Sequence, residues 1–266
     1  MSRIIAIFNQ AGGVGKTTLT RDLGFELSHQ GQRVLLIDGD AQGSLSDFLD
    51  LEPFARPEPE IFWHSLVAYE PDRPFTPFLA RTFEMDIGMS NFTAIECEQR
   101  LADKHVATLL LDALETLHDR YDWILVDCPP SVHEIAVQVL VAADDVLIPV
   151  QTEQKAFMGL TIVQNEIFKA NQRRRRFKPP LKIAGIIPTI FNPYRKVHVF
   201  YKEQIDQLAQ QTLRCPVLPA IHDTIAVTEA SNARVPLKLF KPTCPVNEQI
   251  AQIAAQLRDK ANETSK

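Results

Sequence analysis

Short apolar runs alternate with helix-length segments along most of the chain. The apolar runs are rich in Ile, Leu and Val, and they predict strands at residues 3–8, 33–37, 123–126, 146–150 and 183–187. The intervening segments predict helices at residues 16–30, 104–118, 132–142, 157–175, 196–213 and 247–260. Near-continuous apolar strands between helices indicate a parallel sheet covered on both faces. We therefore predict a doubly wound α/β fold with a mostly parallel sheet, in a single domain over residues 1–266.

Residues 51–95 depart from this alternation. Six of the 18 prolines lie between Leu51 and Pro77, interspersed with aromatic residues. Because proline is excluded from helix interiors and central strands, we expect an irregular excursion from the sheet. Two interpretations remain open, a packed surface excursion and a partner-binding surface, since exposed aromatic residues favour interfaces.

The composition is ordinary for a globular protein, with 45% apolar and 23% charged residues. No apolar run approaches the roughly 18 residues that a membrane span needs. The four cysteines include no C-x-x-C pair, which favours reduced thiols in the cytoplasm over a disulfide framework or a zinc site. The net charge of −5 argues at first against a nucleic-acid partner.

The segment N-Q-A-G-G-V-G-K-T-T at residues 9–18 lies between the first predicted strand and helix. Glycines let backbone amides converge on phosphate oxygens, and the helix N-terminus adds its dipole. The strict P-loop pattern is not met because Gln10 replaces its first glycine; the alternative is a glycine-rich turn. We expect Lys16 to hold the β- and γ-phosphates and Thr17 to bind Mg²⁺. The predicted nucleotide-binding residues are Ala11, Gly12, Gly13, Val14, Gly15, Lys16, Thr17 and Thr18.

Carboxylates follow two of the other predicted strands. Asp38 and Asp40 follow V-L-L-I, and Asp127 follows W-I-L-V. The carboxyl ends of parallel strands form one edge of a sheet, where ligands bind. We therefore predict a P-loop NTPase with a Mg²⁺–nucleotide site, in which Asp40 orients water, Asp38 supports the metal and catalytic water, and Asp127 contacts the metal through water.

The motifs N-Q-A-G-G-V-G-K-T-T, V-L-L-I-D-G-D-A-Q-G-S, Y-D-W-I-L-V-D-C-P-P-S and V-L-I-P-V-Q-T-E resemble the ParA/MinD family of deviant-Walker ATPases, and most closely its ParA branch. The resemblance implies ATP and Mg²⁺ as cofactors and slow ATP hydrolysis by an ATP-sandwich homodimer. It also implies non-specific double-stranded DNA binding, nucleoid association and a separate adaptor protein that stimulates hydrolysis and connects the dimer to cargo.

One position departs from the family pattern. The signature lysine, which in relatives contacts the nucleotide of the other subunit, is replaced here by Ala11. Lys155, shortly after the predicted strand at 146–150, is our candidate for a substitute cation; the alternative is a solvated lysine near a helix start. In lacking this lysine, the chain resembles the carboxysome-positioning (McdA-like) subgroup. The resemblance makes the carboxysome the favoured cargo, with plasmid or chromosome partition as the alternative.

The net charge hides a strong segregation. Residues 169–202 hold ten of the 28 basic residues and no acidic residue. Such segregation is typical of polyanion binding, and the lack of a base-reading motif favours contacts to phosphates. The predicted DNA-binding residues are Arg173, Arg174, Arg175, Arg176, Arg195 and Lys196. The alternative is a solubilising helix end.

Weaker signals suggest further assignments. Asn192 is a candidate adenine contact or a turn residue before Pro193. Cys97 and Cys128 raise an iron–sulfur alternative like the nitrogenase iron protein, against ordinary buried thiols. The C-terminal segment has little positive charge, which favours core packing over a MinD-type membrane helix, so no membrane partner is expected. A P-loop biosynthetic enzyme remains a third functional class.

Overall fold

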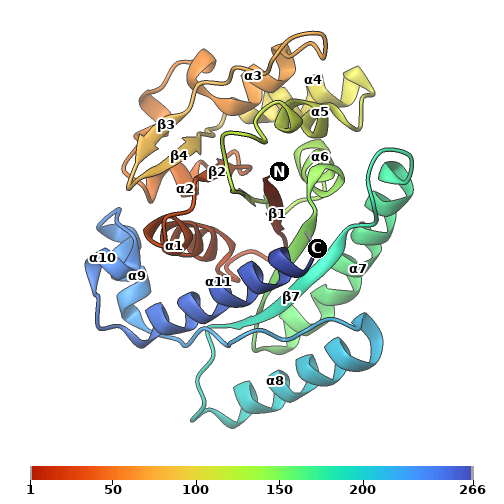
Figure 1. Ribbon diagram of the computed structural model, residues 1–266. Helices are drawn as coiled ribbons and strands as arrows, with labels where there is room; N and C mark the ends of the chain where they lie inside the picture. Colours follow the sequence, from red (N-terminus) through yellow and green to blue (C-terminus); the bar gives the residue numbers. More distant parts are fainter. Residues whose placement is uncertain (1, 265–266) are drawn as a thin grey trace.

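The fold is built on one seven-stranded sheet, as the computed structural model of residues 2–264 shows; the side chains of residues 155–158 and 264 are not described (Figure 1). The strand order is β3-β4-β2-β5-β1-β6-β7. All neighbours pair in parallel except β3 and β4, which are antiparallel. The strands are β1 (Arg3–Ile7), β2 (Val34–Asp38), β3 (Ala80–Thr82), β4 (Met85–Gly88), β5 (Trp123–Asp127), β6 (Asp145–Gln151) and β7 (Lys182–Thr189).

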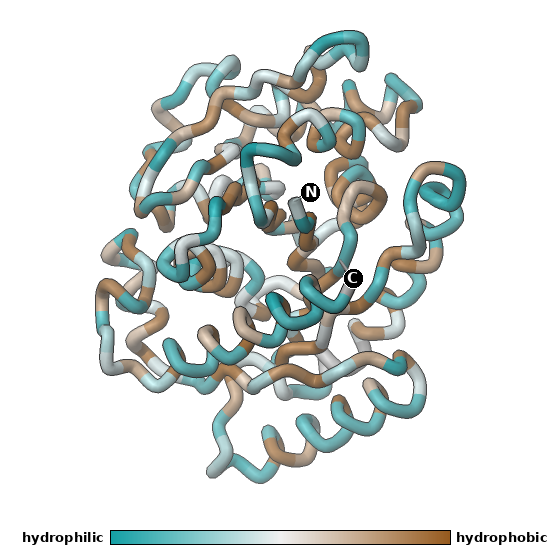
Figure 2. The backbone as a smooth tube through the Cα atoms, viewed as in Figure 1, coloured by the Kyte–Doolittle hydropathy of each residue, from teal (hydrophilic) through white to brown (hydrophobic). Residues whose placement is uncertain are grey.

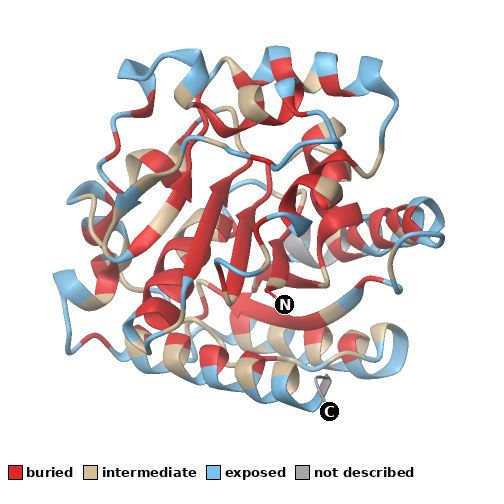
Figure 3. Ribbon diagram, turned by 45° about the horizontal axis from the view of Figure 1, so that its top comes forward, coloured by how far each residue is buried: buried red, intermediate tan, exposed pale blue. Residues whose placement is uncertain are grey.

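Helices cover both faces of the sheet, as predicted. The side chains of β1 alternate, so that Ile4 and Ala6 pack on one face and Ile5 and Ile7 on the other. The first face is covered by α3 (Phe62–Ala68), α4 (Ala94–Lys104), α5 (Leu109–Glu115), α6 (Glu134–Ala142), α7 (Gln154–Arg174) and α8 (Lys196–Leu208). The second is covered by α1 (Lys16–His29), α2 (Ser44–Asp47), α9 (Ile225–Asn232), α10 (Leu237–Phe240) and α11 (Pro245–Thr264). The strands between them are buried, and apolar residues concentrate there (Figures 2 and 3).

Residues 51–95 are more regular than predicted. Two short 3₁₀ turns, η1 (Pro53–Ala55) and η2 (Glu58–Glu60), hold the first prolines, but α3 follows them as a regular helix. Strand β4 pairs with β2 inside the sheet. The expected irregularity is therefore wrong for much of this segment, because its prolines fall in turns and in the irregular residues before β3, which leaves the α3 and β4 backbones free to hydrogen-bond.

The aromatic residues of this segment are mostly core residues. Phe62, Trp63, Tyr69 and Phe75 are buried and form edge-to-face contacts with one another. Phe54 is exposed and stacks on Phe92. Most of the segment thus fits the packed excursion rather than an aromatic binding surface.

The remaining helices differ from the prediction mainly at their ends. The helix predicted at 104–118 is shorter, because α4 ends at Lys104, His105 takes a left-handed conformation (φ 53°), and α5 spans only Leu109–Glu115. The predicted helix at 196–213 is α8 followed by a π-helical turn over Ala209–Leu213. The apolar face of α11, including Ile250 and Ile253, is buried in the core, as expected. Within residues 2–264, no helix combines the length and apolar character that crossing a bilayer requires.

Candidate functional site

The loop between β1 and α1 has the backbone shape of a phosphate-binding loop. Gly13 and Gly15 have positive φ angles of 73° and 86°, which L side chains adopt only with strain. Gly15 is the N-cap of α1, so the free amides and the positive dipole end of a 14-residue helix face the loop. This arrangement can bind the phosphates of a nucleotide.

Lys16 and Thr17 open the helix at this loop. The Lys16 Nζ donates a 3.0 Å hydrogen bond to the Ala11 carbonyl, so the side chain folds back over the loop. Burial lowers the pKa of Lys16, and Asp127 partly offsets this. The Thr17 hydroxyl donates a 2.7 Å hydrogen bond to Oδ2 of Asp127. The sequence-predicted lysine, threonine and strand-end carboxylate therefore meet at one point.

Asp38 and Asp127 are register partners at the ends of β2 and β5. Both are buried, and burial raises the pKa of Asp38 to about 7, although Ser46 donates backbone and hydroxyl hydrogen bonds to its Oδ2. The pKa of Asp127 is also raised, first by burial and then by the neighbouring Asp38 charge. Two buried carboxylates that repel each other favour a positive charge between or beside them.

This donor set fits a magnesium ion. Oδ1 of Asp127 is buried without a hydrogen-bond partner among the described residues, although its Oδ2 is bound by Thr17. No cluster of three or more His, Cys, Asp or Glu side chains able to hold a metal occurs in the described part of the chain. Magnesium is commonly held by one or two protein oxygens together with substrate phosphates and waters, which is the arrangement available here.

Asp40 lies in the turn after β2 and is half-buried. Its amide donates to Oδ1 of Asp38 at 3.2 Å, and its carboxylate accepts from the Gln42 amide at 2.9 Å. The turn therefore places Asp40 beside the buried pair, with access to solvent, as a water-orienting residue requires.

Several residues that position this edge were not singled out from the sequence. The Trp63 indole donates to the Asp38 carbonyl at 2.8 Å, and Ser46 binds the Asp38 carboxylate. At Gly39, a Cβ would lie 2.5 Å from the carbonyl oxygen of Asp127. No motif pointed to Trp63, which lies in the proline-rich segment, but the D-G-D spelling around Gly39 was a usable signal of close backbone approach.

Two polar side chains fix the P-loop to the other half of the sheet. The Asn9 amide donates to the Pro149 carbonyl at the end of β6, and its Oδ1 accepts from the Ala11 amide. The Thr189 hydroxyl, at the end of β7, donates to the Val14 carbonyl at 2.9 Å. Both side chains are buried, so the loop is held from β6 and β7.

A cavity of about 210 Å³ adjoins the P-loop. Thr18 and the loop glycines form one wall, Thr189 and Ile190 another, and the segment from Ile221 to Thr224 a third. This segment runs beside the end of β7 through hydrogen bonds such as that from the Asp223 amide to the Phe191 carbonyl. It was missed from the sequence because it has neither a motif nor a regular element.

Three predicted nucleotide contacts have different outcomes. Asn192 uses its Oδ1 to accept from the Tyr194 amide, as a turn residue does, and its contact with adenine stays a prediction. Ala11 contributes a carbonyl to Lys16, but its methyl group cannot carry the charge of the family lysine. Lys155 falls in the first turn of α7, and its side chain lies outside the described residues.

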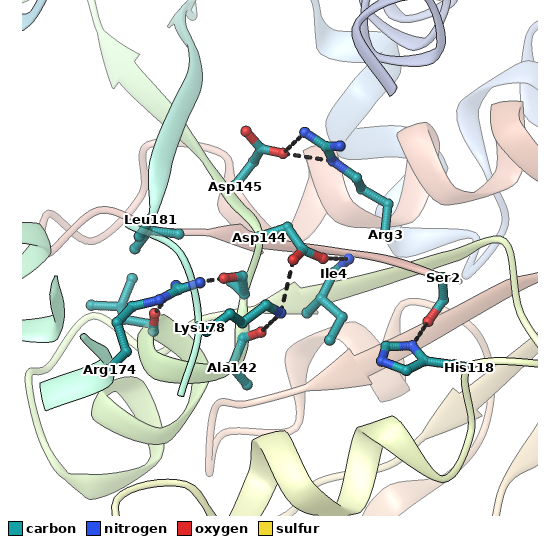
Figure 4. Close-up of polar contacts among 12 residues, drawn as sticks. Ser2, Arg3, Ile4, His118, Ala142, Asp144, Asp145, Arg174, Lys178 and Leu181 are labelled. Carbon is teal, nitrogen blue, oxygen red and sulfur yellow. Dashed lines mark hydrogen bonds and ion pairs between the residues drawn. The ribbon is translucent and has the colours of Figure 1, made fainter. Parts of the chain in front are cut away.

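The prediction that Arg174 binds DNA is wrong for this conformation. Its side chain is 1% exposed, and its Nη1 donates to the carbonyls of Leu140 and Ala143 at the end of α6 (Figure 4). The helical period turns this one arginine inward while Arg173, Arg175 and Arg176 remain exposed. Arg195 and Lys196 are exposed as well, but at the start of α8.

The iron–sulfur alternative has no geometric support. Cys97 and Cys128 are both buried in the core layer between the sheet and its first helical face. Burial raises the pKa of the Cys97 thiol to about 12. Buried, protonated thiols cannot share a cluster with a second subunit, so both cysteines fit the packing role.

Comparison with known proteins agrees with this geometry. A family model described as an AAA domain matches residues 2–183. The sporulation initiation inhibitor protein Soj of Bacillus subtilis is 30% identical over 91% of this chain and 92% of its own length. The chromosome partitioning protein ParA of Myxococcus xanthus is 33% identical over 77% of this chain and 74% of its own.

Solved structures extend the likeness over the whole chain. A Mycobacterium smegmatis structure with bound ADP and magnesium, described as cobyrinic acid a,c-diamide synthase, is 28% identical, with a TM-score of 0.81 and coverage of 98% of this chain and 96% of that one. The apo McdA structure of Cyanothece has a TM-score of 0.82 at 23% identity, covering 97% of this chain and all of that one, and supports the fold.

Proposed function

Because this chain belongs to the AAA-domain family and, within it, to the ParA/MinD group of deviant-Walker ATPases, with ATP and Mg²⁺ as its cofactors, we propose that it is a positioning ATPase that works on DNA. ATP joins two copies of the chain into a sandwich dimer, and the dimer binds nucleoid DNA without sequence preference. A separate adaptor protein on the cargo stimulates hydrolysis, which releases the dimer from DNA. The proposed location is the nucleoid, in the cytoplasm.

The geometry supports a distinct role for each residue at the site. The amides of residues 11–18 and the Lys16 ammonium bind the phosphates, and the 210 Å³ cavity receives the nucleoside. Thr17 and Asp127 hold Mg²⁺, Asp127 through water, with Asp38 supporting them; the ion neutralises charge on the phosphates. Asp40 orients the attacking water. Asn192 is retained as a candidate adenine contact.

One observation carries the DNA-binding part of the proposal. Residues 169–202 contain ten basic and no acidic residues. The side chains of Arg173, Arg175, Arg176, Arg195 and Lys196 are exposed, and none forms an ion pair with another described residue. Exposed cations without protein partners are available to phosphates, and a dimer doubles their number, which makes binding depend on ATP.

The test compares binding of a short labelled DNA duplex with ATP, with ADP and without nucleotide. We expect ATP to increase the affinity severalfold or more, and Lys16→Ala, which cannot hold the phosphates, to abolish the increase. The Arg100→Ala variant, which removes an exposed arginine of α4, is the control for lost charge. Equal affinity in all three nucleotide states would contradict the ATP switch.

A second proposal concerns the lysine that this chain lacks. We propose that Lys155, from the first turn of α7, supplies the positive charge that Ala11 cannot bring to the partner's nucleotide. ATP-dependent dimerisation of Lys155→Ala, measured by light scattering, should be weakened, whereas Lys169→Ala on the same helix should dimerise normally. Normal dimerisation and turnover of Lys155→Ala would refute this role.

The cargo that we propose is the carboxysome, because Ala11 is the departure that the carboxysome-positioning subgroup shows. Chromosome or plasmid partition is the second candidate, favoured by relatives of 30% identity or more that are named for sporulation and chromosome partitioning. Deleting the gene separates the two. Clustered carboxysomes support the first candidate, DNA-free cells or plasmid loss support the second, and neither phenotype would reject both.

A biosynthetic function is the third candidate, raised by the neighbour described as a cobyrinic acid a,c-diamide synthase. An amide-forming enzyme needs its carboxylic-acid substrate to complete ATP turnover, whereas a positioning ATPase hydrolyses ATP with water alone. Steady ATP hydrolysis by the purified protein, stimulated by DNA and unaffected by cobyrinic acid, favours the positioning function.

A further inference from the structure

The ten basic residues of segment 169–202 do not form one surface. The arginine run, Arg173–Arg176, spans the end of α7, next to the residues that precede β6, whereas Arg195 and Lys196 follow the end of β7. β6 and β7 are parallel, with Asp145 opposite Lys182 and Gln151 opposite Thr189. The two groups therefore lie at opposite edges of the sheet, about 26 Å apart along the eight residues of β7. Figure 1 shows the α7–β7 turn at the upper right and the start of α8 at the lower left.

Only one of these groups lies at the same end of the strands as the P-loop. Thr189, at the end of β7, contacts the P-loop through Val14, and Arg195 follows it by six residues. The arginine run is separated from the P-loop by the 21-residue length of α7, about 31 Å. A dimer that closes on its nucleotides brings the two Arg195–Lys196 groups toward each other, but it leaves each arginine run on the far side of its own subunit.

Residues at the amino-terminal ends of the strands hold the arginine run in a fixed position. Arg174 bonds the carbonyls at the end of α6, and the Lys178 Nζ bonds the Ala142 carbonyl and forms a 2.8 Å ion pair with Asp144 (Figure 4). Arg3 in turn binds Asp145. The two nearby carboxylates are thus already paired with other cations, and the charges of the exposed arginines remain uncompensated.

The exposed members are three arginines, Arg173, Arg175 and Arg176, which we call the arginine cap. Guanidinium groups bind phosphate oxygens in a bidentate manner, which favours a phosphate-bearing ligand. The exposed phenylalanines Phe168 and Phe177 flank the cap, but polar exposed residues, including Asn165 and Gln172, interrupt them on α7. A lipid surface requires a continuous apolar face, which the described side chains of α7 do not form, so the phosphodiester backbone of a nucleic acid fits better.

We propose that the arginine cap is a second DNA-binding surface whose affinity does not depend on the bound nucleotide. This proposal rests on the proposed DNA-binding function, and it divides DNA binding between two surfaces. The Arg195–Lys196 group binds DNA only in the ATP dimer, whereas the arginine cap provides weak, salt-sensitive contact in every nucleotide state. A subunit released by hydrolysis therefore stays close to DNA.

The test measures duplex binding between roughly 50 and 200 mM salt with ATP, with ADP and without nucleotide. The arginine cap variant is Arg173→Ala/Arg175→Ala/Arg176→Ala, the second variant is Arg195→Ala/Lys196→Ala, and Arg100→Ala is the control. We expect the cap variant to abolish binding with ADP. Its slope of log affinity against log salt with ATP should fall in magnitude by about 3 for each subunit that contacts the DNA. The second variant should lose affinity only with ATP.

The outcomes separate the two proposals. ATP-specific binding by the wild type with none in ADP at low salt would overturn the arginine cap and leave the proposed function intact. If the wild type bound no duplex in any of the three nucleotide states, both the arginine cap and the proposed DNA-binding function would be rejected. Residual ADP-state binding that the cap variant retains would also overturn the inference. So would binding of the cap to vesicles of phosphatidylserine and phosphatidylcholine, but not to DNA, which would assign it to a lipid surface.

Discussion

Arg174 offers the sharpest test of the structure, because the sequence places it within a run of arginines and the fold gives it a different role. Arg174→Ala removes a fully buried guanidinium that donates to two carbonyls at the end of α6, at 3.1 and 2.6 Å. Burial lowers the pKa of this arginine, but from so high a value that the group stays charged. The substitution should therefore act on stability, not on DNA affinity.

The magnitude follows from these contacts. A hydrogen bond from a charged donor contributes about 1.5–3 kcal/mol, and truncation leaves two carbonyls without this donor beside a new cavity. Removing an arginine whose Nε has no partner within the described chain offsets part of this loss. We expect a net destabilisation of about 3 kcal/mol, which lowers the melting temperature of a chain of this size by roughly 10 °C.

The assay is urea denaturation of the nucleotide-free protein, with Arg175→Ala as the matched control. Arg175 is exposed and without an ion pair to another described residue, so its loss should change the free energy of unfolding by less than about 0.5 kcal/mol. Arg174→Lys should be intermediate, because one ammonium replaces the forked guanidinium. Equal urea midpoints for Arg174→Ala and Arg175→Ala would refute the buried role.

Three further predictions follow from the site and from the opposite edge of the sheet. Thr17→Val, which removes the hydroxyl bound to Asp127, should lower Mg²⁺-dependent ATP turnover by about tenfold or more while binding of ADP without magnesium, measured by calorimetry, persists. Gly39→Ala places a Cβ 2.5 Å from the Asp127 carbonyl oxygen, so it should lower the free energy of unfolding in urea by about 1–3 kcal/mol and weaken MgATP binding. An unchanged MgATP affinity would contradict the close approach. Burial and Lys178 lower the pKa of His118, so below pH 6.5 the unfolded chain binds a proton more readily than the folded chain, and the free energy of unfolding falls with falling pH. The His118→Gln variant should therefore lose less stability between pH 7 and 5 than the wild type.

The sheet and the phosphate site could be predicted because their signals are local. Each central strand is a single apolar run; Asp38 and Asp127 end two of these runs, and Lys16 and Thr17 open the helix that follows the glycine-rich loop after a third. Since parallel strands end at one edge, sequence position alone brings these residues together. The 2.7 Å contact between Thr17 and Asp127 is the outcome.

Other features depend on contacts that no local pattern encodes. Strand β4 has only four residues, and its pairing with β2 and β3 is what makes it a strand. Arg174 differs from Arg173 and Arg175 only in helical phase, and a burial partner 34 residues away decides its role. The cavity beside the P-loop draws one wall from residues 221–224, which hydrogen-bond to the residues at and after the end of β7.

Trp63 gives the protein a built-in optical reporter. The chain has two tryptophans, and the indole of Trp63 bonds the backbone carbonyl of Asp38, whereas Trp123 lies at the start of β5, at the opposite edge of the sheet. Any movement of the Asp38–Asp40 turn on nucleotide exchange changes the polarity around one indole only. The emission of a Trp123→Phe protein would therefore record the movement of that turn in real time, without an attached dye, and stopped-flow mixing with ATP would order it relative to ATP hydrolysis.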